Sequence, residues 1–400
     1  MITWLRVILL FAAGMGAAAQ FGKVSVLFSA WAEVYPDGGA ALGFLVSLVS
    51  LMGVVLGLLA GLVVMRVGFR RTLIWALLAS AVVSALEVFL PPLPVMLVLR
   101  ALEGLPHLAI VVAAPTLLAE ITDERTRPMA MTLWGTYFGV TFALYAVLGP
   151  WMLRLGGVEL VLASHAGFLL LMAGLLWLAL PDDRPLPEGR VAQPAERLGL
   201  RMILARHVTA YSSPFIAAPG VAWLFYAINF VALMTVLPTF LPEATREMQM
   251  TVLPLVGIVS ALTFGALALK LFRAVPVAIA GYLMAAASVV LLVVAPGVVW
   301  APGALFIAMG FMQSGGFASV PQINTDPGDR ALANGVLAQM GNVGNLSGTP
   351  ILLAMTGAFD FAGLIVFSVL FYGLGALVHI LAARMRARRG SGEGALGAAR

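Results

Sequence analysis

The chain has 400 residues, of which 62% are apolar and 10% charged, with a formal net charge of +5 and a mean hydropathy of +1.03. Because soluble domains carry about 25% charged residues, this composition excludes an ordinary water-soluble protein and predicts that lipid surrounds most of the chain. The sequence has no cysteine, which excludes disulfides and thiolate metal sites. Its cations lie in short loops rather than on one polar domain, so we expect no nucleic acid partner.

Twelve apolar stretches follow along the chain, each close to the length of about 20 residues that a helix needs to cross a bilayer. They cover residues 5–31, 41–65, 72–90, 93–119, 129–153, 158–180, 216–241, 251–270, 275–296, 299–323, 331–356 and 360–384. The first continues past Ala19 to Trp31, which favours a retained helix over a cleaved signal peptide. The sequence therefore predicts an all-α, multi-pass membrane protein.

The arginines and lysines indicate the orientation of these helices, because cytoplasmic loops carry an excess of both. With a cytoplasmic N-terminus, nineteen cationic residues lie in the cytoplasmic loops and termini, and only Arg154 and Arg246 lie on the opposite face. We expect both termini to be cytoplasmic and the protein to lie in a cell inner membrane.

The two halves of the sequence repeat each other. Gly104 precedes Pro115 by eleven residues, as Gly310 precedes Pro321, and Thr122-Asp123 matches Thr325-Asp326. The offset stays near 203–206 residues, so the sequence predicts two pseudo-symmetric six-helix bundles with a binding site between them. The predicted parts are a first bundle at 1–181, a cytoplasmic linker at 182–214, a second bundle at 215–389 and a cytoplasmic tail at 390–400.

The loop after the second apolar stretch resembles a family motif. Its residues Gly61-Leu-Val-Val-Met65-Arg66-Val-Gly68-Phe-Arg70-Arg71 resemble the G-x-x-x-D-R-x-G-R-R loop of major facilitator transporters. Met65 stands where the family has an acidic residue that helps to hold the outward-facing state. The resemblance implies a conformational role for Gly61, Arg66, Gly68, Arg70 and Arg71, while topology alone would also explain the arginines. Three arginines can also bind acidic loop ends or lipid phosphates.

Two further motifs resemble the same family. Arg100-Ala-Leu-Glu103-Gly104 is similar to the R-x-x-x-G motif of the fourth helix. Gly149-Pro150 is similar to the Gly-Pro motif in the fifth helix of proton-driven exporters. The resemblance implies the major facilitator fold and a secondary transporter of drugs or metabolites.

Ionisable residues inside apolar helices are costly and usually mark function. Arg100, Glu103 and His107 lie at i, i+3 and i+7, so they share one helical face. Glu103 and His107 are candidates for exchanging a proton, and a self-satisfied buried ion pair is the alternative. Lys23 shares a face of the first helix with Gln20; it either makes the cavity electropositive together with Arg100 or extends to the interface. The electropositive alternative favours an anionic or zwitterionic substrate.

The second half carries uncharged polar residues at comparable depths, for which hydrogen bonding between helices is the alternative explanation. The predicted substrate contacts over both halves are Gln20, Lys23, Arg100, His107, Tyr137, Thr141, Tyr226, Asn229, Gln313, Asn342 and Asn345. Glu87, His165 and His379 lie toward the ends of helices that we expect to face lipid.

The sequence shows no nucleotide-binding loop, no cluster of metal ligands and no nucleophile with a base, so we expect no cofactor and no enzyme activity. The leading hypothesis is a monomeric transporter with protons as coupling ion, which exports a small organic solute by antiport. Uptake of an organic anion by proton symport is the alternative. A lipid flippase or a membrane sensor would represent a different class.

Overall fold

The computed structural model describes residues 2–183, 200–294, 298 and 300–397, and every element in these ranges is helical. The first half contains α1 (Ile2–Ser25), α2 (Phe28–Val34), η1 (Pro36–Ala41), α3 (Leu42–Ser47), η2 (Leu48–Ser50), α4 (Leu51–Val67), α5 (Phe69–Glu87), α6 (Leu93–Ile121), α7 (Arg127–Trp134) and α8 (Tyr137–Ala179). The second half contains α9 (Leu200–Ser212), α10 (Ala217–Val236), η3 (Leu237–Phe240), α11 (Glu243–Ser260), η4 (Ala261–Gly265), α12 (Ala266–Leu271), α13 (Ala274–Val294), α14 (Trp300–Ile323) and α15 (Pro327–Gly397).

Ten helical stretches in the described part of the chain are long and apolar enough to cross a membrane. Two of them are too long for one crossing: α8 has 43 residues and α15 has 71, and about 20 suffice. Each contains a break with non-helical backbone angles, at Gly156 and Gly157 in α8 and at Asp360 in α15. The breaks divide each into two segments, which gives the twelve that the sequence predicts and confirms the all-α membrane fold.

The segment boundaries differ from the prediction where the helices are irregular. The predicted first helix at 5–31 ends at Ser25, and the short helix α2 follows it. The predicted second helix at 41–65 begins at Pro36 with a 3-10 turn and is interrupted again at Leu48. Hydropathy averages over such breaks, because the residues on both sides are equally apolar.

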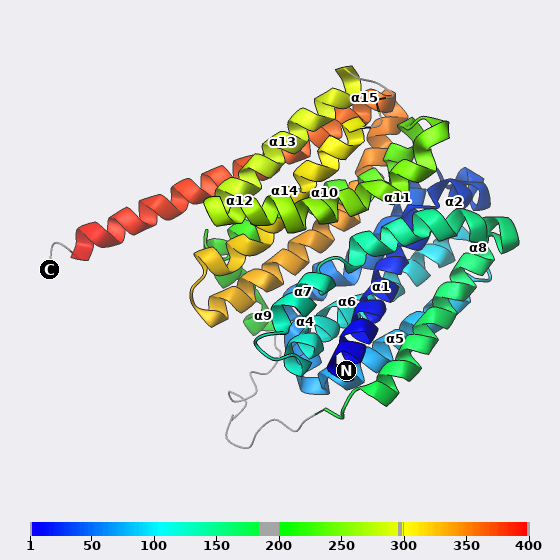
Figure 1. Cartoon of the computed structure of the whole chain (residues 1–400), viewed down its shortest axis with the longest axis horizontal. Helices are drawn as coiled ribbons and strands as arrows, with labels where there is room; N and C mark the ends of the chain where they lie inside the picture. Colours follow the sequence, from blue (N-terminus) through cyan, green and yellow to red (C-terminus); the bar gives the residue numbers. More distant parts are fainter. Residues whose placement is uncertain (1, 184–199, 295–297, 299, 398–400) are drawn as a thin grey trace.

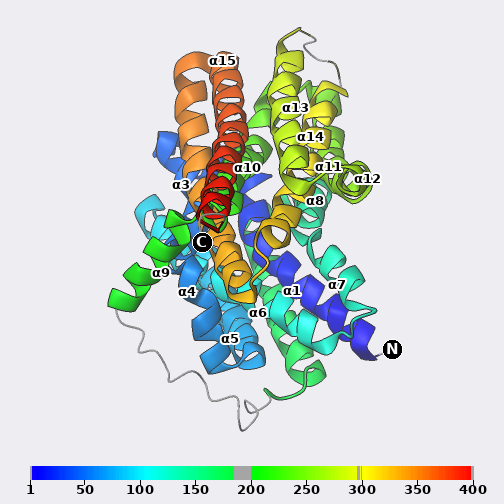
Figure 2. The ribbon, with the colours of Figure 1, turned by 90° about the vertical axis from the view of Figure 1, so that its left-hand side faces the viewer.

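The two halves form two separate groups of helices, coloured blue to green and green to red (Figures 1 and 2). Their repeat is visible in hydrogen bonds as well as in sequence. Asp123 Oδ1 accepts from the backbone N–H of Thr126 at 2.8 Å, and Asp326 Oδ1 accepts from that of Asp329 at 3.0 Å. The hydrogen bonds from Thr126 lower the pKa of the Asp123 carboxyl. The same turn thus opens α7 and α15.

Glycines allow the closest helix packing in the second half. A side chain at Gly344 of α15 would lie 2.7 Å from the Ile228 nitrogen of α10. Gly348 faces the Ile228 carbonyl, and Gly341 faces the ring of Trp223. The stripe of small residues therefore packs α15 directly against the backbone of α10.

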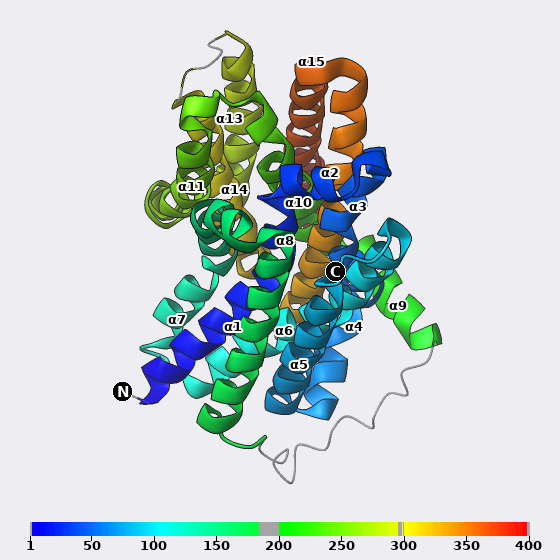
Figure 3. The same ribbon diagram turned by 90° about the vertical axis from the view of Figure 1, so that its right-hand side faces the viewer.

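The helix α9 lies within the predicted linker and contacts both halves, and it lies beside α4 in Figures 2 and 3. Gln339 of α15 is the centre of this contact: its Nε2 donates to Val54 O at 2.8 Å, and its Oε1 accepts from Tyr211 Oη at 2.7 Å. His207 Nε2 lies 3.2 Å from Gln339 Nε2. The predicted linker at 182–214 falls partly on residues 184–199, outside the described residues, whereas the helix over 390–397 continues α15 into the predicted tail.

Candidate functional site

A group of buried polar side chains lies inside the first half of the molecule, where four helices meet. Its members are Gln20 and Lys23 of α1, Ser80, Ser84 and Glu87 of α5, Arg100, Glu103 and His107 of α6, and His165 of α8. The four charged members, Lys23, Glu87, Arg100 and Glu103, have an exposed fraction of 0%. We call these four the charge cluster.

Lys23 lies at the centre of the charge cluster. Its Nζ is 2.6 Å from Glu87 Oε2 and 2.9 Å from Glu103 Oε1. Two longer contacts of 3.3 Å join Nζ to Ser84 Oγ and His165 Nδ1. One ammonium group therefore links α1 with α5, α6 and α8.

Arg100 supplies the second positive charge. Its Nη1 forms an ion pair with Glu103 Oε2 and a longer one, at 3.4 Å, with Glu87 Oε1. Its Nε donates to Leu45 O at 2.7 Å, and its Nη2 donates to Gln20 O. The planar guanidinium thus binds two carboxylates and two carbonyls at once.

His107 joins the charge cluster through Gln20 rather than through Glu103. The distance from His107 Nδ1 to Gln20 Oε1 is 2.7 Å, and Gln20 Nε2 donates to Ser80 Oγ at 2.6 Å. The described hydrogen bonds of Glu103 go to Lys23 and Arg100 instead. A proton that moves between Glu103 and His107 would therefore pass through an intermediate group.

The charge cluster contains two cations and two anions, so its formal charge is zero when all four are ionised. This corrects the electropositive cavity expected from Lys23 and Arg100, because Glu87 and Glu103 compensate both charges. Burial of four ions is costly unless each is paired and hydrogen-bonded, which explains why their contacts are so dense.

Ser80, Ser84, Glu87 and His165 are members that the sequence did not predict, and Glu87 and His165 were expected on helices that face lipid. His165 Nε2 lies 2.9 Å from Gly16 O, and its exposed fraction is 2%. A signal for α5 is nevertheless present: Ser80, Ser84 and Glu87 lie at i, i+4 and i+7, one polar face in an apolar helix. No comparable pattern surrounds His165.

Aromatic rings fill the contact between the two halves. The centroids of Phe138 in α8 and Phe230 in α10 are 6.0 Å apart. Tyr137 neighbours Phe138 at 5.9 Å, and Tyr226 stacks on Phe230 at 5.8 Å. The predicted contacts Tyr137 and Tyr226 are half-buried, and each neighbours one ring of the Phe138–Phe230 pair in this aromatic layer. Phe21 lies 5.6 Å from Phe138 and 5.3 Å from His107.

The other predicted substrate contacts are scattered. Asn229 is buried, and its Oδ1 has no hydrogen-bond partner among the described residues. Gln313 Nε2 donates across the halves to Gly135 O at 3.4 Å, whereas Asn342 donates to a carbonyl of its own helix. Thr141 Oγ1 lies 2.7 Å from the carbonyl of Tyr137 on its own helix and 3.5 Å from that of Met15 on α1. Asn345 is half-buried on α15.

The predicted conformational loop is held by the end of α8. Gly68 has a φ of 99°, which reverses the chain before α5. Asp183 accepts from the backbone N–H groups of Arg70 at 2.8 Å and Arg71 at 3.1 Å, and so caps the first turn of α5. Arg70 Nη1 donates to Asp182 Oδ1 at 2.8 Å. Gly61, Met65 and Arg66 lie exposed on the last turns of α4.

Among the described residues, no group of three or more His, Cys, Asp or Glu side chains could hold a metal ion.

Comparisons with known proteins agree with this architecture. No curated protein matches the sequence. A solved structure with the same fold is a bacterial homologue of the human lysosomal transporter Spinster, in an inward-facing and unoccupied conformation, with a TM-score of 0.74 and 14% identity over 96% of this chain and 97% of that one. The family model of the Major Facilitator Superfamily matches residues 6–326. The chain therefore belongs to the Major Facilitator Superfamily of membrane transporters.

Proposed function

We propose that this transporter moves a small organic solute, anionic or zwitterionic, by alternating access and couples its movement to protons. The observation that carries the proposal is the charge cluster, in which two carboxylates are buried at membrane depth with exposed fractions of 0%. Such groups are rare inside membranes and usually belong to substrate or proton pathways.

Charge balance supports a coupling role for Glu103. When Glu103 binds a proton, Lys23 and Arg100 share the single negative charge of Glu87. The cluster then has a surplus positive charge, which raises its affinity for an acid group. His107 is the titratable side chain next to the cluster: its Nδ1 lies 2.7 Å from Gln20 Oε1, and the backbone carbonyl of Gln20 accepts from Arg100.

The aromatic layer supports a solute site between the halves. Tyr137, Phe138, Tyr226 and Phe230 lie where α8 meets α10, and Gln313 adds a polar group from α14. Alternating access changes the contacts at this boundary, so a solute bound there would be exposed to each side in turn.

Export in exchange for protons is supported by the similarity of Gly149-Pro150 to the exporter motif, and it requires proton and solute to bind the cluster alternately rather than together. Gly149 packs against Leu27, which lies between α1 and α2. Proton-symport uptake of an organic anion is the second candidate, since protonation of Glu103 would make the cluster attract an anion. With nineteen cationic residues on one face, both termini would be cytoplasmic and the membrane the cell inner membrane.

A thermal-shift screen of the purified protein in detergent tests the proposed substrate class. The panel holds organic acids, zwitterions, amphipathic cations and lipids, each at two pH values. We expect acids or zwitterions to raise the unfolding midpoint, more strongly at the lower pH, and Glu103→Gln to remove this pH dependence. Stabilisation by cations alone would contradict the proposed substrate class, and stabilisation by lipids alone would favour a flippase.

A further inference from the structure

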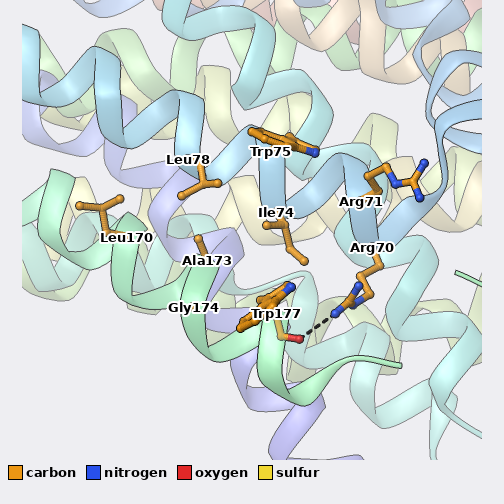
Figure 4. Close-up of a pocket in the computed structure, with 9 residues that line it drawn as sticks. All are labelled: Arg70, Arg71, Ile74, Trp75, Leu78, Leu170, Ala173, Gly174 and Trp177. Carbon is orange, nitrogen blue, oxygen red and sulfur yellow. Dashed lines mark hydrogen bonds between the residues drawn. The ribbon is translucent and has the colours of Figure 1, made fainter. Parts of the chain in front are cut away.

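A groove lies on the outer side of the first half, between α5 and α8, and none of its lining residues belongs to the charge cluster (Figure 4). Its volume is about 500 Å³. The residues that line it are Arg70, Arg71, Ile74, Trp75, Leu78, Leu170, Ala173, Gly174 and Trp177. All but the two arginines are apolar. The groove is therefore apolar along most of its length and basic at one end, and it suits an apolar group.

The apolar part of the groove is open to lipid. Trp75 and Trp177 are 66% and 60% exposed, and they come from the two different helices that form the walls. At Gly174, a side-chain carbon would meet no other atom within 4 Å, so the floor is unfilled. Tryptophans are typical of the membrane interface, and the space between them is suited to an acyl chain.

The two arginines at the basic end of the groove differ in the partners of their guanidinium groups. Arg70 is neutralised, because its guanidinium donates to Asp182 Oδ1 and to Trp177 O, both at 2.8 Å. The exposed Arg71 guanidinium has neither a hydrogen bond nor an ion pair with any described residue; only its backbone N–H binds Asp183. In Figure 4, both arginines lie at the same end of the groove, and Leu170 lies at the other.

We propose that this groove binds one anionic phospholipid, with the phosphate on Arg71 and an acyl chain over Ala173 and Gly174. Basic pockets between membrane helices bind acidic lipid headgroups, and here the charge and the apolar groove are continuous. The lipid would join α5 to α8 beside the contact between Arg70 and Trp177. This inference depends on the membrane location of the chain and not on proton coupling.

Native mass spectrometry of the delipidated protein tests the charge requirement. Dioleoyl-phosphatidylglycerol and dioleoyl-phosphatidylcholine have the same acyl chains, so their comparison isolates the headgroup. We expect one phosphatidylglycerol to bind more tightly than phosphatidylcholine, and Arg71→Gln to weaken it about fivefold. Arg125→Gln, which removes an exposed arginine outside the groove, should leave it unchanged. Equal binding of both lipids, or equal losses in both variants, would overturn the proposal.

A second pair of variants tests the groove itself. Gly174→Leu fills the floor, while Gly167→Leu is the matched control, because Gly167 lies on the same helix with the same open space but does not line the groove. We expect Gly174→Leu to abolish tight binding of one phosphatidylglycerol molecule and Gly167→Leu to retain this binding. If Gly174→Leu binds the lipid as the wild type does, the arginine attracts lipid only by charge and the groove is not a site.

Discussion

Lys23 Nζ lies 2.6 Å from Glu87 Oε2, and neither side chain is exposed. The pair connects α1 with α5 in the interior of the first half, and Arg100 and Glu103 extend it to α6. A neutral set of four buried ions stabilises the bundle only while it stays complete, because a lone buried charge has no water to solvate it. The same dependence makes the cluster sensitive to one proton or one bound ion.

Removal of one charge from the cluster is expected to destabilise the protein strongly. Lys23→Met leaves two carboxylates opposite Arg100 alone, and breaking a buried pair in this way costs about 3–5 kcal/mol. The double variant Lys23→Met/Glu87→Gln restores neutrality and should recover much of the loss. Thermal midpoints in detergent, taken at one scan rate, measure both effects. A double variant less stable than either single variant would contradict the charge-balance account.

The two aspartates at the end of α8 are expected to differ in their importance. Asp183→Ala removes the acceptor for two N–H groups in the first turn of α5, at a cost of about 0.5–2 kcal/mol. Asp182→Ala removes only an ion pair whose carboxylate is 93% exposed, and such pairs contribute below about 1 kcal/mol. Asp183→Ala should therefore lower the unfolding midpoint more than Asp182→Ala does. A larger decrease for Asp182→Ala would show that Asp183 is not the cap.

Gln339 is expected to couple α9 to the helices of both halves. A double-mutant cycle with Tyr211→Phe and Gln339→Leu should give an interaction free energy of about 0.5–1.5 kcal/mol, the usual value of one hydrogen bond. Asn334→Leu is the control on the same helix, because Asn334 is exposed. Additive effects of Tyr211→Phe and Gln339→Leu would contradict the contact.

Close packing of α15 against α10 predicts that Gly344 tolerates no side chain. Gly344→Leu places atoms on the backbone of α10, and we expect loss of the folded protein, since overpacking costs about 1–3 kcal/mol or more. Gly373→Leu, on the same helix with no atom within 4 Å of the added carbon, should fold normally. Fluorescence-detected size-exclusion chromatography distinguishes the two outcomes, and equal behaviour would contradict the packing.

Much of the fold is predictable from the sequence because hydropathy and repetition are local properties. The periodicity of Arg100, Glu103 and His107 correctly predicts one buried face of α6. Their partners are not local: Lys23 and Gln20 lie 80 and 87 residues from Glu103 and His107. These distant groups form the hydrogen bonds that a direct contact between Glu103 and His107 would need. Helical spacing alone therefore predicts the shared face but not the hydrogen-bond partners.

The loop between α4 and α5 illustrates the same limit. Met65 removes the acidic residue expected from the family motif, so the sequence leaves the loop arginines without an obvious partner. In the structure, Asp182 supplies the carboxylate for the Arg70 guanidinium from 112 residues away. Only the tertiary packing of α5 against α8 brings these residues together.

Transport by reconstituted protein tests the coupling role of the charge cluster most directly. The solute found in the thermal-shift screen is loaded into proteoliposomes, and its movement is followed together with the internal pH. We predict that an imposed proton gradient drives uphill transport by the wild type and by Glu124→Gln, a control with an exposed carboxylate. Glu103→Gln should lose uphill transport and proton flux but retain exchange of labelled for unlabelled solute. Uphill transport by Glu103→Gln would contradict the account.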